Sequence, residues 1–277
     1  MHPKNDADGE SKVRHILSIS GGKDSAALAV YLRDRIPQVE YVFCDTHEEL
    51  PETYEYIGRL EAFLGKPIHR LNPERSFEWY LRHKGGYLPS ARIRWCTSQL
   101  KIKPFEAFVG SDTVRSYIGI RADEERAGYI STKPNIIPVY PFREDGVVLA
   151  DVYRILEEAG LGLPSYYSWR SRSGCYFCFF QRRIEWVGLY EQHPKLFEKA
   201  RKFEEMKTLN GQRFTWSDRE SLAELTRPER IEAIKLEYQV ALEREQKRQA
   251  AGCRLADAFS SVMESQQSEE ACTICRL

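Results

Sequence analysis

Two groups of residues in this sequence have types and spacing that suit chemistry. The first is SGGKDS, which spans residues 20–25. Its two glycines let the backbone approach an anion closely, its lysine adds a positive charge, and its serines can donate hydroxyl hydrogen bonds. The second group is the cysteines, of which Cys175 and Cys178 are separated by two residues. One turn can therefore present both thiolates to a single metal, and Gly174 eases the bend.

The other cysteines extend this metal hypothesis and leave alternatives open. Cys96 follows two arginines and is the natural third ligand, which would leave a fourth position free. Zinc held by three cysteines and a water or histidine is one alternative, and a pair of buried free thiols is another. Cys44 lies inside a predicted strand, so we expect it in the core. Cys272 and Cys275 form a second Cys-x-x-Cys, where they either relay persulfide sulfur or are inert.

The glycine loop is predicted to lie between a strand and a helix. VRHILSIS, residues 13–20, indicates a short buried strand, and residues 25–36 carry apolar positions at helical spacing. At such a junction the free backbone N–H groups and the positive end of the helix dipole face one gap, which favours an anion. The loop is shorter than the G-x-x-x-x-G-K-S/T loop of the common NTPases. The alternative is a glycine turn with an incidental lysine.

Strands and helices continue to alternate along the chain. Further strands are predicted over residues 38–46, 66–71 and 116–120, with an extended segment over residues 135–142. Further helices are predicted over residues 52–65 and 151–161. This alternation predicts an α/β fold with a doubly wound, mostly parallel sheet, in which ligands bind at the carboxyl ends of the strands.

The character of the sequence changes near residue 166. Aromatic residues, arginines and the Cys-x-x-Cys precede two strongly charged segments that we expect to be helical, residues 185–207 and 227–252. They would form a C-terminal helical appendage. The predicted division is a flexible N-terminus (1–12), a domain with the glycine loop (13–165), a cysteine-motif and helical region (166–252) and a flexible tail (253–277).

Composition excludes several classes of protein. The formal net charge is zero, so the whole molecule is not a general polyanion binder. No apolar run approaches the roughly 20 residues of a membrane span, and the polar start lacks the apolar core of a signal peptide. We therefore expect a cytoplasmic protein whose seven cysteines stay out of disulfides. Arginines nevertheless cluster around the proposed cysteine site, at Arg92, Arg94, Arg170, Arg172, Arg182 and Arg183.

Five motifs together carry a resemblance to a known family. SGGKDS resembles the pyrophosphate loop (PP-loop) of the ATP pyrophosphatases, which cleave ATP between its α- and β-phosphates. VFCDTHEELPET is similar to the second-strand signature of the phosphoadenylyl-sulfate (PAPS) reductase family. RWCTSQLKIKPF, YIGIRADEERAG and SGCYFC follow in the order expected of that family's sulfur-transfer members. The resemblance covers roughly residues 13–185 and implies the Rossmann-like fold of the adenine nucleotide alpha hydrolases, with residues 13–165 as the ATP pyrophosphatase domain.

The resemblance also implies roles for individual residues. ATP and Mg²⁺ are the expected ligands, with Lys23, Asp24 and Arg121 catalytic, because the planar fork of an arginine suits phosphate oxygens in a transition state. Asp45 would accept from a ribose hydroxyl or hold Mg²⁺, and capping a turn is its alternative role. The residues expected to bind ATP or pyrophosphate are Ser20, Gly21, Gly22, Lys23, Asp24, Ser25, Asp45 and Thr46.

Related thiolases hold a four-iron cluster on three cysteines. The resemblance therefore implies a 4Fe-4S cluster on Cys96, Cys175 and Cys178, with one iron free for sulfide or substrate, and zinc remains the alternative. The aromatic neighbours of the pair favour a shielded site.

The motifs allow three functions from different classes. PAPS reductases use a cysteine in a Glu-Cys-Gly-Leu-His stretch near the C-terminus, where this chain has EEACTICRL, so reduction of PAPS or a related sulfonucleotide is a weaker alternative. An enzyme that adenylates an oxygen and replaces it with sulfur fits better. The chain most resembles the ATP pyrophosphatase of DNA phosphorothioation systems, and tRNA thiolation is the alternative. A nucleotide-binding sensor would bind ATP without releasing pyrophosphate.

The sulfur-transfer hypothesis also implies partners. A cysteine desulfurase is expected as the sulfur donor, and nucleic acid as the acceptor, with DNA favoured over tRNA. No membrane partner is expected. A second copy of the chain, in a homodimer, is the remaining candidate.

Overall fold

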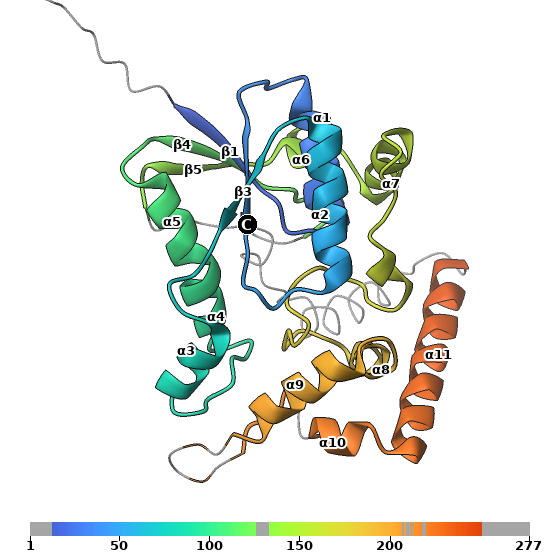
Figure 1. The fold of residues 1–277 in the computed structure, drawn as a ribbon. Helices are drawn as coiled ribbons and strands as arrows, with labels where there is room; N and C mark the ends of the chain where they lie inside the picture. The colour runs from blue at the N-terminus through green and yellow to red at the C-terminus, as the bar shows by residue number, and fades with distance from the viewer. Residues whose placement is uncertain are drawn as a thin grey trace, which may run out of the picture.

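A parallel five-stranded sheet lies at the centre of the computed structural model, which describes residues 13–125, 133–206, 208, 211, 213–217 and 220–250 (Figure 1). Its strand order is β3-β2-β1-β4-β5. The bounds are β1 (Arg14–Ser18), β2 (Glu40–Cys44), β3 (Ile68–Leu71), β4 (Val114–Tyr117) and β5 (Ile136–Val139). All five lie within or close to the segments predicted from the sequence, and the α/β doubly wound fold is confirmed.

Alternating residues of the strands face two separate layers of helices. Leu17 of β1 belongs to one buried cluster, which it shares with the helices α1, α2 and α7. Ile16, its neighbour, belongs to another, which it shares with α5. The bounds of these helices are α1 (Lys23–Arg33), α2 (Pro51–Leu64), α5 (Lys103–Val109) and α7 (Leu149–Glu158). Side chains alternate between the two faces of a strand, and each face of this sheet packs against helices. The strands are therefore buried on both sides.

Residues 77–109 contain helices that were not predicted from the sequence pattern. They are α3 (Phe77–His83), α4 (Trp95–Thr97), the π-helical turn η1 (Ser98–Ile102) and then α5. A short helix, α6 (Pro141–Glu144), follows β5. π-helical turns are frequent at functional sites, and this one begins two residues after Cys96.

A second core lies among the helices beyond residue 166 and receives residues from the first half of the chain. The ring of Phe77 packs at a tilt against Phe177, with centroids 4.1 Å apart, and Phe177 stacks on Trp216 at 5.2 Å. Leu50, Trp95 and Trp186 complete the same buried cluster. The cysteine-bearing segment is therefore packed between the two halves of the chain.

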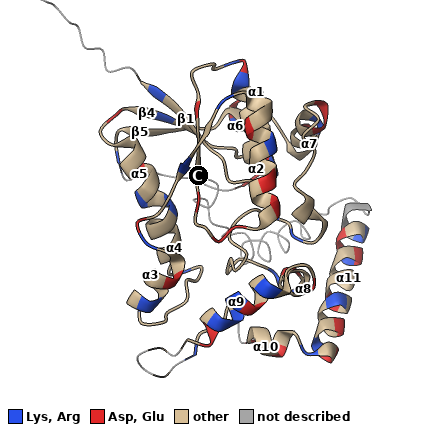
Figure 2. Cartoon of the chain, in the orientation of Figure 1, with Lys and Arg blue, Asp and Glu red and all other residues tan. Residues whose placement is uncertain are grey.

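The charged segment predicted as one helix over residues 185–207 is instead two helices. They are α8 (Arg183–Gln192) and α9 (Pro194–Glu204), and the chain turns at His193. Pro194 has no backbone N–H to continue α8, but it is well suited to the first position of a new helix. The remaining helices are α10 (Leu222–Leu225) and α11 (Pro228–Ala250), and Figure 2 shows both signs of charge along α9 and α11.

Several predictions concern residues that the structure does not describe. The N-terminal segment 1–12, the tail 253–277, and Cys272 and Cys275 within that tail lie outside the described residues. Among the helices that are described, none is long and apolar enough to cross a membrane.

Candidate functional site

The glycine loop lies where the order of the strands in the sheet reverses. The chain leaves β1 toward β2 and β3, whereas β4 and β5 continue on the other side of β1. The carboxyl ends of β1 and β4 therefore flank a crevice of the type that binds ligands in open α/β sheets. Gly119, just after β4, has the carbonyl oxygen of Asp24 only 3.0 Å from the position a Cβ would take. A glycine is needed there because the two loops approach so closely.

The N-cap residue of α1 is Gly22, which has no side chain to cap the first turn. No N-cap side chain therefore occupies the positive end of the helix, where an anion is favoured. Gly21 has φ +74°, a conformation that other residues adopt at a cost. Ser25 fixes the loop from inside, since its hydroxyl donates to the carbonyl of Gly22 at 3.1 Å and accepts from the N–H of Ser20 at 3.1 Å.

The three residues predicted to be catalytic lie together. Arg121 donates to Asp24 at 2.7 Å, and the ammonium of Lys23 lies 3.3 Å from the other oxygen of the same carboxylate. Arg121 also pairs with Asp123 at 2.8 Å and Glu124 at 2.6 Å. Asp24 is almost fully buried. Carboxylates thus balance both cations in this conformation, and an incoming phosphate would take over part of that role.

Asp45 makes the contacts of a turn cap. It accepts from the N–H of His47 at 2.9 Å and from the hydroxyl of Tyr54 at 2.8 Å. His47 has φ +61°, which such a turn accommodates. The capping alternative therefore describes this conformation, and the ribose or Mg²⁺ role of Asp45 stays a prediction.

The three predicted cysteine ligands line one small pocket. Cys96, Cys175 and Cys178 share it with Thr46 and Lys101, and the other lining residues include Pro89, Leu100, Phe177 and Phe179. Cys178 donates its N–H to the carbonyl of Cys175 at 3.0 Å, the turn expected of the Cys-x-x-Cys spacing. Tertiary structure therefore brings Cys96 to the pair across about 80 residues of sequence. Cys44 does not line this pocket, although its thiol donates to the carbonyl of Lys101 at 3.5 Å, and burial raises its pKa to about 11.

Glu49, which sequence reasoning did not single out, lies beside Cys175. One carboxylate oxygen of Glu49 is 3.7 Å from the sulfur, accepts from Thr46 at 3.1 Å and lies 4.0 Å from the ammonium of Lys101. The pKa of the Cys175 thiol is raised well above its usual range, first by burial and then by the negative charge of Glu49, against which Lys101 acts. The only sequence signal for Glu49 was its place inside VFCDTHEELPET.

The types of the side chains that line this pocket, although not their spacing in this conformation, suit a metal centre. Thiolates are the ligands that iron–sulfur clusters and zinc take in proteins. The second oxygen of Glu49 is buried and has no donor among the residues that the structure describes. A buried acceptor of this kind usually indicates a missing partner. In the described part of the chain no three His, Cys, Asp or Glu side chains are grouped closely enough to hold one metal ion.

A bridging segment, residues 165–175, joins the glycine loop to the cysteine pocket. It begins with the short helix η2 (Ser165–Ser168), in which the buried hydroxyl of Tyr166 donates to the carbonyl of Gly21 at 2.8 Å. The hydroxyl of Tyr167 accepts from the N–H of Lys23 at 3.3 Å. Further along, Ser173 donates to Ser20 at 3.2 Å, and Cys175 lies 3.3 Å from Thr46. Sequence reasoning missed these tyrosines and Ser173, because their partners lie about 145 residues away.

The predicted arginine cluster divides into different environments. Arg170 is buried and donates to the carbonyls of Gly174 and Cys175, so it holds the cysteine turn in place. Arg94 and Arg172 both lie over the ring of Phe180, at 5.2 and 5.0 Å. Arg182 pairs with Glu185 and Arg183 with Glu220. Both side chains keep about half of their surface exposed.

We expect Gly21→Ala to destabilise the fold more than Gly65→Ala, its matched control. Both positions have positive φ, which costs about 1–2 kcal/mol for alanine. At Gly21 a Cβ would also lie 2.5 Å from the Cγ2 methyl of Thr53, whereas nothing lies within 4 Å of the corresponding atom at Gly65. The clash should add about 1–3 kcal/mol to the loss in the free energy of unfolding, measured by urea denaturation.

Thr53→Ser tests the cause of that difference, because it removes the Cγ2 methyl and keeps the hydroxyl. In the double variant with Gly21→Ala, the loss beyond that of Gly65→Ala should largely disappear. Strictly additive losses would contradict the clash.

Comparisons with known proteins place the glycine loop within a described domain. Residues 14–135 match the model of the phosphoadenosine phosphosulfate reductase domain. An uncharacterized protein of Methanocaldococcus jannaschii is 29% identical over 198 residues, 66% of this chain and 40% of that protein. The tRNA-specific 2-thiouridylase MnmA of Pediococcus pentosaceus is 28% identical over 214 residues, 65% of this chain and 56% of that protein. The chain thus spans about half the length of these curated relatives.

Among solved structures, the U34-tRNA thiolase NcsA from Methanococcus maripaludis, determined with its 4Fe-4S cluster, aligns with a TM-score of 0.40 and 14% identity. The alignment covers 70% of this chain and 71% of that chain.

Proposed function

Because residues 14–135 form a phosphoadenosine phosphosulfate reductase domain of the PP-loop kind, we propose that this chain is an ATP pyrophosphatase that activates an oxygen of a nucleic acid for replacement by sulfur. One observation carries the proposal. The bridging segment contacts Gly21 and Lys23 near one end and delivers Cys175 to Thr46 at the other. A phosphate-binding loop and a thiol pocket joined in this way suit a reaction that couples ATP cleavage to sulfur transfer.

In the first step the acceptor oxygen attacks the α-phosphorus of ATP. The bond from that phosphorus to the bridging oxygen breaks, and pyrophosphate leaves with the bonding electrons. The positive end of α1 and the ammonium of Lys23 hold the departing pyrophosphate. Arg121 exchanges carboxylate partners for phosphate oxygens as negative charge develops on them. Asp45 binds Mg²⁺ or a ribose hydroxyl.

In the second step hydrosulfide attacks the phosphorus or carbon atom that carries the adenylated oxygen. The bond from that atom to the oxygen breaks, and AMP leaves with the former acceptor oxygen and the bonding electrons. The sulfur enters at the oxidation level of sulfide, so this exchange needs no oxidant or reductant. A cysteine desulfurase supplies the sulfur as persulfide, and a thiol reductant releases it as sulfide. Cys96, Cys175 and Cys178 would hold the metal centre, a 4Fe-4S cluster or zinc as the alternative. When bound, such a centre would keep sulfide close to the activated acceptor.

The acceptor that we favour is a backbone phosphate oxygen of DNA. The support is the resemblance of the motifs, SGGKDS and RWCT with GCYFC, to the ATP pyrophosphatase of DNA phosphorothioation systems. A tRNA base is the second candidate, and the similarity to a tRNA-specific 2-thiouridylase favours it.

Product analysis tests the proposed reaction. Anaerobic protein with ATP, Mg²⁺, sulfide and nucleic acid should release AMP and pyrophosphate in equal amounts, separated by ion-exchange chromatography. Release of ADP and phosphate would contradict the proposal, and ATP binding without pyrophosphate release would indicate a sensor.

Deletion of the gene in its host distinguishes the acceptors. Loss of sulfur from DNA with thiolated tRNA intact would support the DNA acceptor. Intact DNA sulfur with unthiolated tRNA would contradict the DNA acceptor and support the tRNA base.

A further inference from the structure

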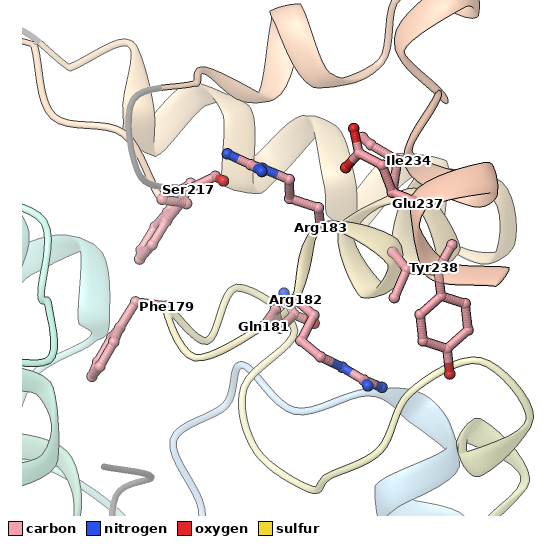
Figure 3. Close-up of a pocket in the computed structure, with 10 residues that line it drawn as sticks. Phe179, Gln181, Arg182, Arg183, Ser217, Ile234, Glu237 and Tyr238 are labelled. Carbon is pink, nitrogen blue, oxygen red and sulfur yellow. The ribbon is translucent and has the colours of Figure 1, made fainter. Parts of the chain in front are cut away.

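Two adjoining pockets form a groove that leads away from the glycine loop. The first, of about 570 Å³, extends from Lys23 and Arg121 to the helices α8 and α11. The second, of about 430 Å³, lies beyond it, between the start of α8 and α11 (Figure 3). The two share Arg182, Ile184 and Tyr238 in their linings. Both volumes lie in the range of small-molecule sites.

The first pocket combines positive charge with aromatic faces. Its lining contains the cations Lys23, Arg121, Arg170, Arg182 and Lys235, against one carboxylate, that of Glu191. Its aromatic lining residues are Tyr153, Tyr167, Trp169 and Tyr238. Cations suit the phosphates of a nucleic acid, and aromatic rings suit the faces of its bases.

The cations at the outer end are the ones that a strand can reach. The Arg182 side chain is 50% exposed, and its guanidinium lies 5.3 Å from the ring centroid of Tyr238. Lys235 is 41% exposed and pairs with Glu191 at 2.8 Å. Arg170 is buried and occupied by backbone carbonyls. Arg182 therefore offers a phosphate contact next to an aromatic ring, one face of which its own guanidinium covers.

The second pocket continues the same chemistry toward the cysteines. Figure 3 shows Arg182 directed toward Tyr238, whereas Arg183 points to the other side, toward Ser217. Phe179 lines this pocket and also the cysteine pocket. The groove thus begins at the glycine loop and ends next to the residues proposed to bind the metal.

We propose that this groove binds a single-stranded nucleic acid, with one unpaired nucleotide in the first pocket and the neighbouring strand across the second. A duplex keeps its bases stacked on one another, so only an unpaired base can reach the face of Tyr238. This inference rests on the proposed nucleic-acid acceptor and specifies the form in which the acceptor is bound.

Equilibrium binding of short labelled oligonucleotides to the full chain, followed by fluorescence anisotropy, tests the groove. Single-stranded DNA or RNA should bind more tightly than a duplex of the same sequence. Tyr238→Ala should weaken single-strand binding about tenfold, because one stacked base is lost. Arg182→Gln should weaken it as well and reduce the slope of log K against log salt by about 0.7, the value for one phosphate contact on a single strand.

Two matched controls lie outside the groove. Tyr190→Ala removes a tyrosine that is 38% exposed on α8, and Arg35→Gln removes an exposed arginine that pairs with Asp145. Both should leave the affinity unchanged, and circular dichroism melts should show that all four variants are folded.

Three results would overturn the proposal that this groove binds a single strand. The first is unchanged affinity in both Tyr238→Ala and Arg182→Gln, and the second is tighter binding of duplex than of single strand. The third is displacement of the strand by a non-hydrolysable ATP analogue. Loss of binding in the groove variants together with ADP as the ATP product would refute the proposed reaction alone. AMP and pyrophosphate as products with unaltered variant affinities would refute the groove alone.

Discussion

Lys23→Ala should lower the release of AMP and pyrophosphate from ATP by about 100- to 1,000-fold, the loss typical of one electrostatic contact to a developing charge in a preorganised site. Lys23 is 8% exposed and lies at the N-terminus of α1, so its charge acts where little water screens it. Arg121 still pairs with Asp24 in this variant, and the fold should therefore persist. Initial rates with ATP in excess measure the effect.

Lys195→Ala is the matched control for that experiment. Lys195 is exposed on α9 and does not line the groove, so its removal should leave the rate unchanged. Undiminished AMP release by Lys23→Ala would show that the glycine loop does not bind the departing pyrophosphate.

Serine at Cys96, Cys175 or Cys178 should each remove the broad visible absorption of anaerobically purified protein and most of its iron. The three sulfurs line one pocket, and a cluster with three protein ligands has none to spare. Iron and sulfide per chain, together with the optical spectrum, measure the effect independently of ATP turnover.

Cys44→Ala provides the control, because Cys44 is a buried free cysteine that lies outside that pocket. It should keep the iron and the spectrum of the unchanged chain. Stoichiometric zinc without iron in anaerobic protein would contradict the cluster and support zinc, whereas a Cys96→Ser variant with full iron content would remove Cys96 from the ligand set.

Local sequence patterns were sufficient to predict the strands of the sheet, the glycine loop and the Cys-x-x-Cys turn. The predicted strands and the helices over residues 25–36, 52–65 and 151–161 are present, because their periods of burial are encoded within single segments. The resemblance to the PAPS reductase family is confirmed for residues 14–135. The place of Gly21, Gly22 and Lys23 between a strand and a helix could be predicted from their neighbours alone, because the apolar periods on either side define β1 and α1.

Tertiary structure decided how those motifs meet. The sequence contained Glu49, Tyr166 and Ser173 without indicating that they join the glycine loop and the cysteine pocket, since contacts between distant segments leave no local period. Burial of Arg170 could not be predicted from the sequence either. This charged residue lies in a basic run, and its burial is possible because its guanidinium donates to two backbone carbonyls. Local propensity acts over a few residues, whereas burial and hydrogen-bond partners depend on which segments the whole chain packs together.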